Sequence, residues 1–195
     1  VASRGLGDVY KRQPPLSSNS AIEYFITATN ISNNSVSHPN AGWHAFNTLE
    51  GQVGELIIEY SSDWNLIGLP LAVENAIYTL LFPESIEGTL YTIEGNYDLA
   101  TSLINGEGYW LRFENEGETI ISGYPYNEIT ISLNEGWNLI SGISSIVEIE
   151  SIHDPSGIII SGTFYEFEEG YSLVDNMVPG RGYCIRTNFS GEIII

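Results

Sequence analysis

Basic residues are scarce in this chain of 195 residues, which has six lysines and arginines against 25 aspartates and glutamates. The formal net charge is −19 at pH 7. A surface so rich in carboxylates repels the phosphates of nucleic acids and the headgroups of anionic lipids. The composition therefore predicts that the chain has no nucleic-acid partner.

Long apolar runs and cysteines are also lacking. No stretch approaches the roughly 18 apolar residues of a membrane-spanning helix, so we expect no membrane insertion. The first 20 residues lack the apolar segment of about 7–15 residues that a secretory signal peptide contains. The single cysteine, Cys184, has no partner for an internal disulfide. It takes the place of an aromatic residue in the repeat described below, so we expect a small core residue rather than a reactive thiol.

The first 13 residues differ in composition from the rest. They contain Arg4, Lys11 and Arg12, which are half of the basic residues. The stretch GDVYKRQ (7–13) resembles the translated end of a sequencing-library transposon adaptor, a scar found on open reading frames from metagenomic reads. We therefore leave residues 1–13 out of the fold prediction, with a natural basic or disordered linker as the alternative. Without them, 24 acidic and three basic residues remain, a net charge of −21.

The chain contains an internal duplication, visible when it is aligned with itself at an offset of 73 and then 74 residues. The matching blocks are ELIIEYSSDWNLIG (55–68) with EITISLNEGWNLIS (128–141), LYTIEGNYDL (90–99) with FYEFEEGYSL (164–173), and GEGYWLRFENEGETII (106–121) with GRGYCIRTNFSGEIII (180–195). The blocks follow in the same order in both copies. We therefore expect two similar structural units.

Each block predicts β-strands. The segments are rich in Ile, Tyr, Phe and Thr, several alternate between apolar and polar residues, and Gly, Asn, Asp and Pro bound them. No window keeps an apolar period of 3.6 over a full helix, and the best short candidate is 73–86, which Pro83 would end. We therefore expect an all-β fold of two tandem, similar antiparallel repeats, sandwich-like or barrel-like. One closed barrel and two packed sheets both remain open, and the small size of each half favours a shared core.

A set of residues recurs at matching positions in the two copies, and we call it the structural signature. Its members are Trp64, Asn65, Gly106, Gly108, Tyr109, Trp110, Arg112, Trp137, Asn138, Gly180, Gly182, Tyr183, Cys184 and Arg186. A phosphate-binding loop would need a helix after its glycines, but both Gly-x-Gly stretches precede a predicted strand. We therefore expect the glycine pairs to supply turns with positive φ, each entering a strand whose aromatic side chain faces the core.

We expect the repeated tryptophans and arginines to stabilise the fold. Trp64 and Trp137 are expected to anchor the core, and the asparagine that follows each is expected to hydrogen-bond the neighbouring backbone. Arg112 and Arg186 hold matching places among many carboxylates. We expect both to form salt bridges within the chain, with contact to an anionic ligand as the alternative.

The phrases GWNLIS (136–141), FYEFEEGY (164–171) and PGRGYCIR (179–186) resemble a recurring β module of secreted and cell-surface proteins of Bacteroidota and neighbouring phyla. Such proteins are often exported by the type IX secretion system. The resemblance covers residues 55–195 in two copies, and the second departs from it at Cys184, where Trp is usual. It implies an extracellular or cell-surface location.

The segment 21–48 resembles the last strands of an immunoglobulin-like or fibronectin-III-like domain. Together with the adaptor-like stretch and the duplication, this resemblance gives the expected division: 1–13 an adaptor scar or disordered, 14–50 the remnant of that domain, 51–127 the first repeat, and 128–195 the second. We expect the second repeat to be truncated, because GEIII ends inside a strand that continues in the first copy. Both ends therefore suit a fragment of a larger protein.

Catalytic and metal-binding motifs are missing from the sequence. His38 and His44 stand six apart across Pro39, in a predicted loop, without the spacing of a zinc site. No nucleophile elbow occurs, and no motif joins a histidine to Cys184. We expect neither catalysis nor a cofactor. Calcium is left open, because SSDW (61–64) and NEGW (134–137) offer oxygen ligands, although both are equally typical of hairpin turns.

Three functions remain. The first is a non-catalytic extracellular module for adhesion, spacing or interaction. The second is an accessory module of a secreted peptidase or polysaccharide-degrading enzyme. The third is a carbohydrate-binding module with exposed aromatic platforms, which the expected burial of the aromatics disfavours. The expected partners are neighbouring domains of the same chain and a surface glycan or protein.

Overall fold

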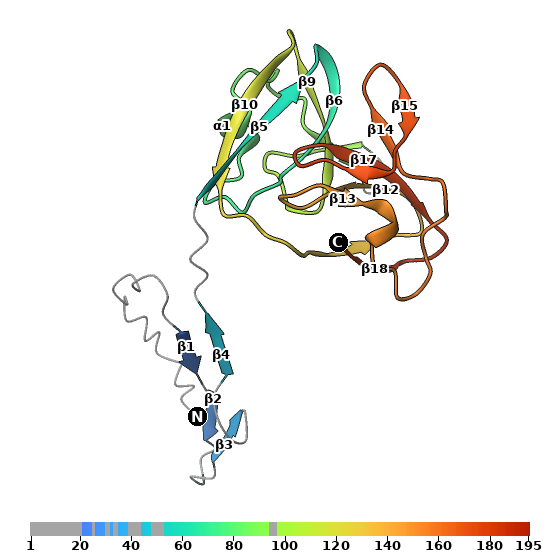
Figure 1. Cartoon of the computed structure of the whole chain (residues 1–195). Coiled ribbons are helices and arrows are strands. Elements are labelled where there is room, and N and C mark those ends of the chain that lie inside the picture. Colours follow the sequence, from blue (N-terminus) through green and yellow to red (C-terminus); the bar gives the residue numbers. More distant parts are fainter. Residues whose placement is uncertain are drawn as a thin grey trace, which may run out of the picture. The chain divides into compact units, whose positions relative to one another are not determined.

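The computed structural model divides the chain into two compact units, residues 1–50 and 51–195 (Figure 1). The residues that the structure describes are 21–24, 26–29, 32, 35–38, 44–47, 53–93 and 97–195. Residues 1–13, with their predicted adaptor scar, lie outside this set.

Four short strands form antiparallel pairs in the first unit. They are β1 (Ala21–Tyr24), β2 (Ile26–Thr29), β3 (Ser35–His38) and β4 (His44–Asn47), with β1 paired to β4 and β2 paired to β3. His38 and His44 lie on strands and not in the predicted loop, because pairing with Ile26 and Tyr24 extends each strand to its histidine. The immunoglobulin-like origin of this unit stays a prediction.

The second unit is all-β and antiparallel, as the sequence predicts. We call residues 51–127 its first half and 128–195 its second half. The elements of the first half are β5 (Gly54–Tyr60), β6 (Asp63–Gly68), α1 (Tyr78–Leu81), β7 (Tyr91–Ile93), β8 (Tyr97–Leu99), β9 (Gly108–Phe113) and β10 (Gly117–Gly123). Only one turn of the helix candidate 73–86 is helical.

The second half consists of strands and one short 3-10 turn. Its elements are β11 (Thr130–Leu133), β12 (Gly136–Ser141), β13 (Val147–Glu148), the 3-10 turn η1 (Ile149–Ser151), β14 (Tyr165–Phe167), β15 (Tyr171–Leu173), β16 (Asn176–Met177), β17 (Gly182–Thr187) and β18 (Gly191–Ile194). In Figure 1 the hairpin of β14 and β15 projects from this half.

The two halves have matching sheets. A two-stranded sheet joins β5 to β10 in the first half and β11 to β18 in the second. A four-stranded sheet has the order β6-β9-β7-β8 in the first half and β12-β17-β14-β15 in the second. The registers correspond as well, since Leu66 pairs with Trp110 and Leu139 with Cys184. Equivalent sequence positions therefore occupy equivalent places in the two sheets.

Each half has its own apolar core, and a third cluster lies between the two four-stranded sheets. Tyr109 and Leu111 on β9 point into the first core, and Tyr183 and Ile185 on β17 into the second. The intervening residues on these strands point the other way, into the third cluster, which contains Leu66, Trp110, Leu139 and Cys184. The single shared core that the sequence favours does not form, because each four-stranded sheet covers a core of its own.

The first glycine of each Gly-x-Gly pair makes a turn. Gly106 has φ of 87° and Gly180 has φ of 85°, a conformation that L side chains rarely adopt. These turns also touch the opposite half. A Cβ on Gly106 would lie 3.0 Å from Ile129 Cδ1, and a Cβ on Gly180 would lie 2.2 Å from Ile58 Cδ1. The turn of each half therefore packs against an isoleucine side chain of the other half.

The second glycine of each pair has another role, and the prediction of a positive φ there is wrong. A Cβ on Gly108 would lie 2.7 Å from the carbonyl oxygen of Ile140, and one on Gly182 would lie 2.7 Å from that of Ile67. Both carbonyls belong to the opposite half. Glycine is needed at these places because two backbones approach closely.

Backbone hydrogen bonds join the halves in the same reciprocal way. The amide of Gly68 donates to the carbonyl of Gly180 at 3.0 Å, and the amide of Ser141 donates to the carbonyl of Gly106 at 2.9 Å. Gly68 and Ser141 are equivalent in the two copies, as are Gly106 and Gly180. The two halves therefore meet through pairs of equivalent contacts.

Candidate functional site

Aromatic side chains of both halves form a continuous row along the third cluster. The row, called the aromatic array below, consists of Trp64, Tyr91, Trp110, Phe167, Tyr171, Tyr165 and Trp137. Its ring centroids lie 4.8–6.4 Å from their neighbours, in tilted and edge-on contacts. Such geometries are the favourable ones for aromatic pairs. Ring contacts lead from Trp64 to Trp137, its equivalent in the second half, and Tyr91 joins the array beside Trp64.

Part of this aromatic surface is open to solvent. Trp137 is 51% exposed and Tyr171 is 57% exposed, and Tyr97 beside the array is 62% exposed. Trp110, near the middle, is 8% exposed, and its indole Nε1 has no hydrogen-bond partner among the described residues. The array is thus anchored at its middle and accessible toward its second-half end.

Two hollows lie along the array. The larger has a volume of about 480 Å³ and is lined by Ile93, Tyr97, Trp137, Asn138, Leu139, Tyr165, Tyr171 and Cys184. The smaller has a volume of about 380 Å³ and is lined by Trp64, Tyr91, Tyr97 and Trp110. The first four-stranded sheet alone lines the smaller hollow, both four-stranded sheets line the larger one, and Tyr97 contributes to each.

Cys184 and Trp110 account for the difference between the hollows. They hold equivalent positions, on β17 and β9, and each lines one hollow. A thiol occupies much less volume than an indole, so the second half leaves more space above its sheet. The expectation that Cys184 is a small buried residue fits its burial, and its small size helps to shape the larger hollow.

The lining of both hollows is uncharged. No Asp, Glu, Lys, Arg or His is among the described lining residues. Burial raises the pKa of the Cys184 thiol to about 11. Burial, followed by the proximity of Cys184, raises the pKa of the Tyr171 phenol to about 12. Both groups are therefore protonated at neutral pH, although the chain as a whole is strongly acidic.

An arginine lies over the tryptophan at each end of the array. The guanidinium carbon of Arg112 is 6.0 Å from the ring centroid of Trp64, and that of Arg186 is 5.9 Å from that of Trp137. These distances are within the range of cation–π attraction. The arginines thus help to hold the orientation of the end rings.

The salt bridges predicted for the two arginines form at only one of them. Arg112 Nε lies 2.7 Å from an oxygen of Asp63, in an exposed pair. Arg186 makes no ion pair with the part of the chain that the structure describes. The reason is that Gly136, without a carboxylate, stands in the second half where Asp63 stands in the first.

The prediction that Trp137 anchors the core is wrong, and Trp64 is only partly buried. Each tryptophan lies two residues before the leucine that enters the third cluster, so its side chain points to the array and not to a core. The alternation of residues along each strand predicts on which face the tryptophan lies. It does not predict that the opposite half leaves this face partly exposed to solvent.

The two repeated asparagines hold the turns that precede the array strands. The side-chain amide of Asn65 donates to the carbonyl of Ser61 at 2.8 Å and its oxygen accepts from the Ser61 amide at 2.9 Å. Asn138 makes the same two bonds with Asn134, at 2.8 and 2.9 Å. These side chains therefore fix the backbone beside Trp64 and Trp137 and are not free for a ligand.

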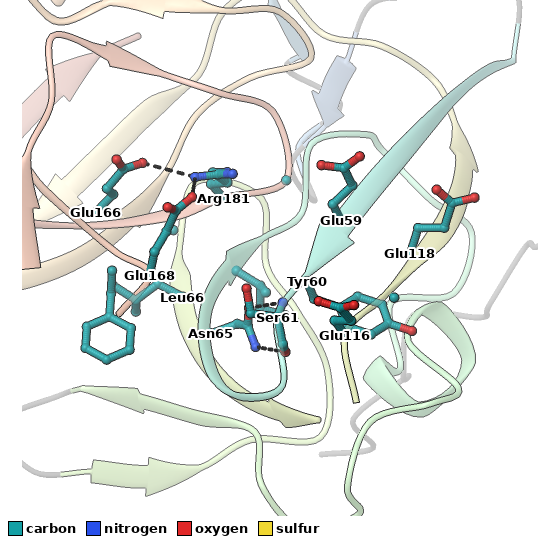
Figure 2. Close-up of a pocket in the computed structure, with 15 residues that line it drawn as sticks. Glu59, Tyr60, Ser61, Asn65, Leu66, Glu116, Glu118, Glu166, Glu168 and Arg181 are labelled. Carbon is teal, nitrogen blue, oxygen red and sulfur yellow. Dashed lines mark hydrogen bonds and ion pairs between the residues drawn. The ribbon is translucent and has the colours of Figure 1, made fainter. Parts of the chain in front are cut away.

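A third hollow, of about 580 Å³, is lined by Phe167 of the aromatic array and is strongly acidic (Figure 2). The glutamates in its lining are Glu59, Glu116, Glu118, Glu166 and Glu168. Arg181 lies 2.7 Å from Glu168 and 3.2 Å from Glu166, and Figure 2 shows the other three glutamates on the opposite side of the hollow. Within the described part of the chain, no group of His, Cys, Asp or Glu is suited to hold a metal ion.

We expect the pKa of Cys184 to be visible in its reactivity. Alkylation by iodoacetamide requires the thiolate, so its rate in the folded protein should rise with a midpoint near pH 11. In urea the midpoint should return to about the ordinary value of 8.5. Because folding raises the pKa, the buried thiol contributes its full stabilisation below about pH 8.5 and loses this contribution as pH rises toward 11. Mass spectrometry of the alkylated protein gives the rates, and a folded midpoint near 9 would contradict the burial of the thiol.

None of the helices in the described residues has the length and apolarity to cross a membrane. Comparison with known proteins gives no family assignment: the chain matches no protein-family model, no curated protein and no solved structure.

Proposed function

We propose that this chain is a non-catalytic module of an extracellular or cell-surface protein, and that its aromatic array binds an uncharged carbohydrate. The observation that carries the proposal is the uncharged, solvent-open aromatic surface on a chain with a net charge of −19. Of the three functions that the sequence leaves open, this surface favours the carbohydrate-binding one.

The chemistry of the larger hollow suits a sugar ring. The faces of a pyranose carry C–H groups that stack on aromatic rings, and its edges carry hydroxyls that need hydrogen-bond partners. Trp137 offers an exposed ring, and the hydroxyls of Tyr97 and Tyr171 can each donate and accept hydrogen bonds. A binding site of this kind has an apolar lining with a few polar groups.

The charges of the chain argue against ionic ligands. A polyanionic glycan would meet the repulsion of 25 acidic residues. A cationic ligand would lose hydration in a hollow whose lining contains no carboxylate. An uncharged ligand meets neither this repulsion nor this loss of hydration. If the bound glycan belongs to the surface of another cell, the module would act in adhesion.

Binding to a panel of immobilised neutral, acidic and amino-sugar glycans tests the proposal. We expect binding to neutral glycans, weakened by roughly tenfold or more in Trp137→Ala and retained in Trp137→Tyr, because stacking needs an aromatic ring. Phe189→Ala is the matched control, since Phe189 is exposed and lines neither hollow. Equal binding by Trp137→Ala, or no binding to any neutral glycan, would contradict the proposal and leave a spacer as the better function.

A further inference from the structure

The two hollows adjoin one another along the aromatic array. Tyr97 lines both of them, and the array leads from Trp64 in the smaller to Trp137 in the larger without a break in ring contacts. We infer that the hollows are neighbouring subsites for one chain of neutral sugar units, so that the module prefers an oligosaccharide to a single sugar. This inference rests on the proposed function.

Both hollows present the same pair of rings. Trp64 and Tyr91 lie 5.9 Å apart at 56°, and Trp137 and Tyr165 lie 6.0 Å apart at 54°. The members of the two pairs hold equivalent positions in the two halves, and an arginine lies over each tryptophan. A ligand made of repeated units matches a surface made of repeated ring pairs.

The two subsites differ in volume. Cys184 leaves the larger hollow open, whereas Trp110 fills the equivalent space in the first half. Trp137 is also more exposed than Trp64. The larger hollow is therefore the main subsite, and the smaller adds affinity only for a ligand long enough to pass Tyr97.

The dependence of affinity on the length of the oligosaccharide distinguishes two neighbouring subsites from a single site. The probes are disaccharides and hexasaccharides of β-1,4-linked glucose, xylose and mannose, titrated calorimetrically into the full chain. For the series that binds, we expect the hexasaccharide to bind roughly tenfold more tightly than the disaccharide, because each further stacked ring adds affinity. Trp64→Ala should reduce hexasaccharide affinity to that of the disaccharide and leave disaccharide affinity unchanged. Trp137→Ala should weaken both.

Two controls keep the result interpretable. Phe189→Ala tests the loss of an exposed aromatic side chain outside both hollows. Tyr91→Ala removes the second ring of the smaller hollow and should reproduce the effect of Trp64→Ala, so a local distortion by one variant does not decide the outcome. Circular dichroism confirms the fold of each variant.

The outcomes separate the two proposals. Equal affinity for both lengths, or hexasaccharide affinity unchanged in both Trp64→Ala and Tyr91→Ala, would overturn the two-subsite arrangement while the proposed function stands. An absence of binding by every neutral probe in the panel of glycans and in this series would overturn both.

Discussion

Replacing Gly182 with alanine is expected to destabilise the second unit by about 3 kcal/mol, since added atoms in packed regions force backbone shifts. The new Cβ would lie 2.7 Å from the carbonyl oxygen and 3.1 Å from the amide nitrogen of Ile67 in the opposite half. These are backbone atoms, and no side-chain rotation relieves the clash. The two halves would have to separate locally, which weakens the nearby hydrogen bond between Gly68 and Gly180.

A matched control distinguishes this clash from a general effect of alanine. Gly170 lies in a turn without positive φ, and a Cβ there would meet nothing within 4 Å. Gly170→Ala should therefore leave stability unchanged or slightly raised. Urea denaturation followed by circular dichroism gives both values. Equal stability of the Gly182→Ala and Gly170→Ala variants would contradict the close contact between the halves.

The second large effect is expected when a fully buried core residue is truncated. Leu111 on β9 and Ile185 on β17 hold equivalent positions in the two cores, and both are completely buried. Replacement of either by alanine should cost about 3–4 kcal/mol, from the lost apolar burial and the cavity that remains. The loss should be similar for the two variants because both side chains are completely buried at equivalent positions of their sheets.

The same variants test whether the halves unfold together. The reciprocal hydrogen bonds and the third cluster join the cores, so the Ile185→Ala variant should open β9 as well as β17. Hydrogen exchange measured by mass spectrometry should show faster exchange in peptides from both strands. Faster exchange in β17 alone would show that each half unfolds independently and would contradict a single cooperative unit.

Much of the fold could be predicted from the sequence because its signals are local. Alternation and turn residues predict an all-β chain, and glycines at 106 and 180 predict positive φ, which both have. The duplication also predicts which positions are equivalent. Each of these inferences needs only neighbouring residues or a comparison of the chain with itself.

The candidate site could not be predicted in the same way, because it depends on how the two halves pack. Periodicity places Trp137 on one face of its strand, but only the position of the opposite half decides that the face is half open. The role of Gly108 likewise depends on the backbone of Ile140, which the duplication alone does not bring near. The exchange of Trp110 for Cys184 is visible in the sequence, but the hollow that it leaves beside the buried thiol is visible only in the structure.

The most direct test of the proposed function is a map of chemical-shift changes on addition of a neutral oligosaccharide that binds. The proposal predicts that the largest changes occur at Trp137, Tyr165 and Tyr171, with none at Glu59 or Glu118 in the acidic hollow. Changes confined to the acidic hollow, with the aromatic signals unmoved, would contradict carbohydrate binding by the aromatic array.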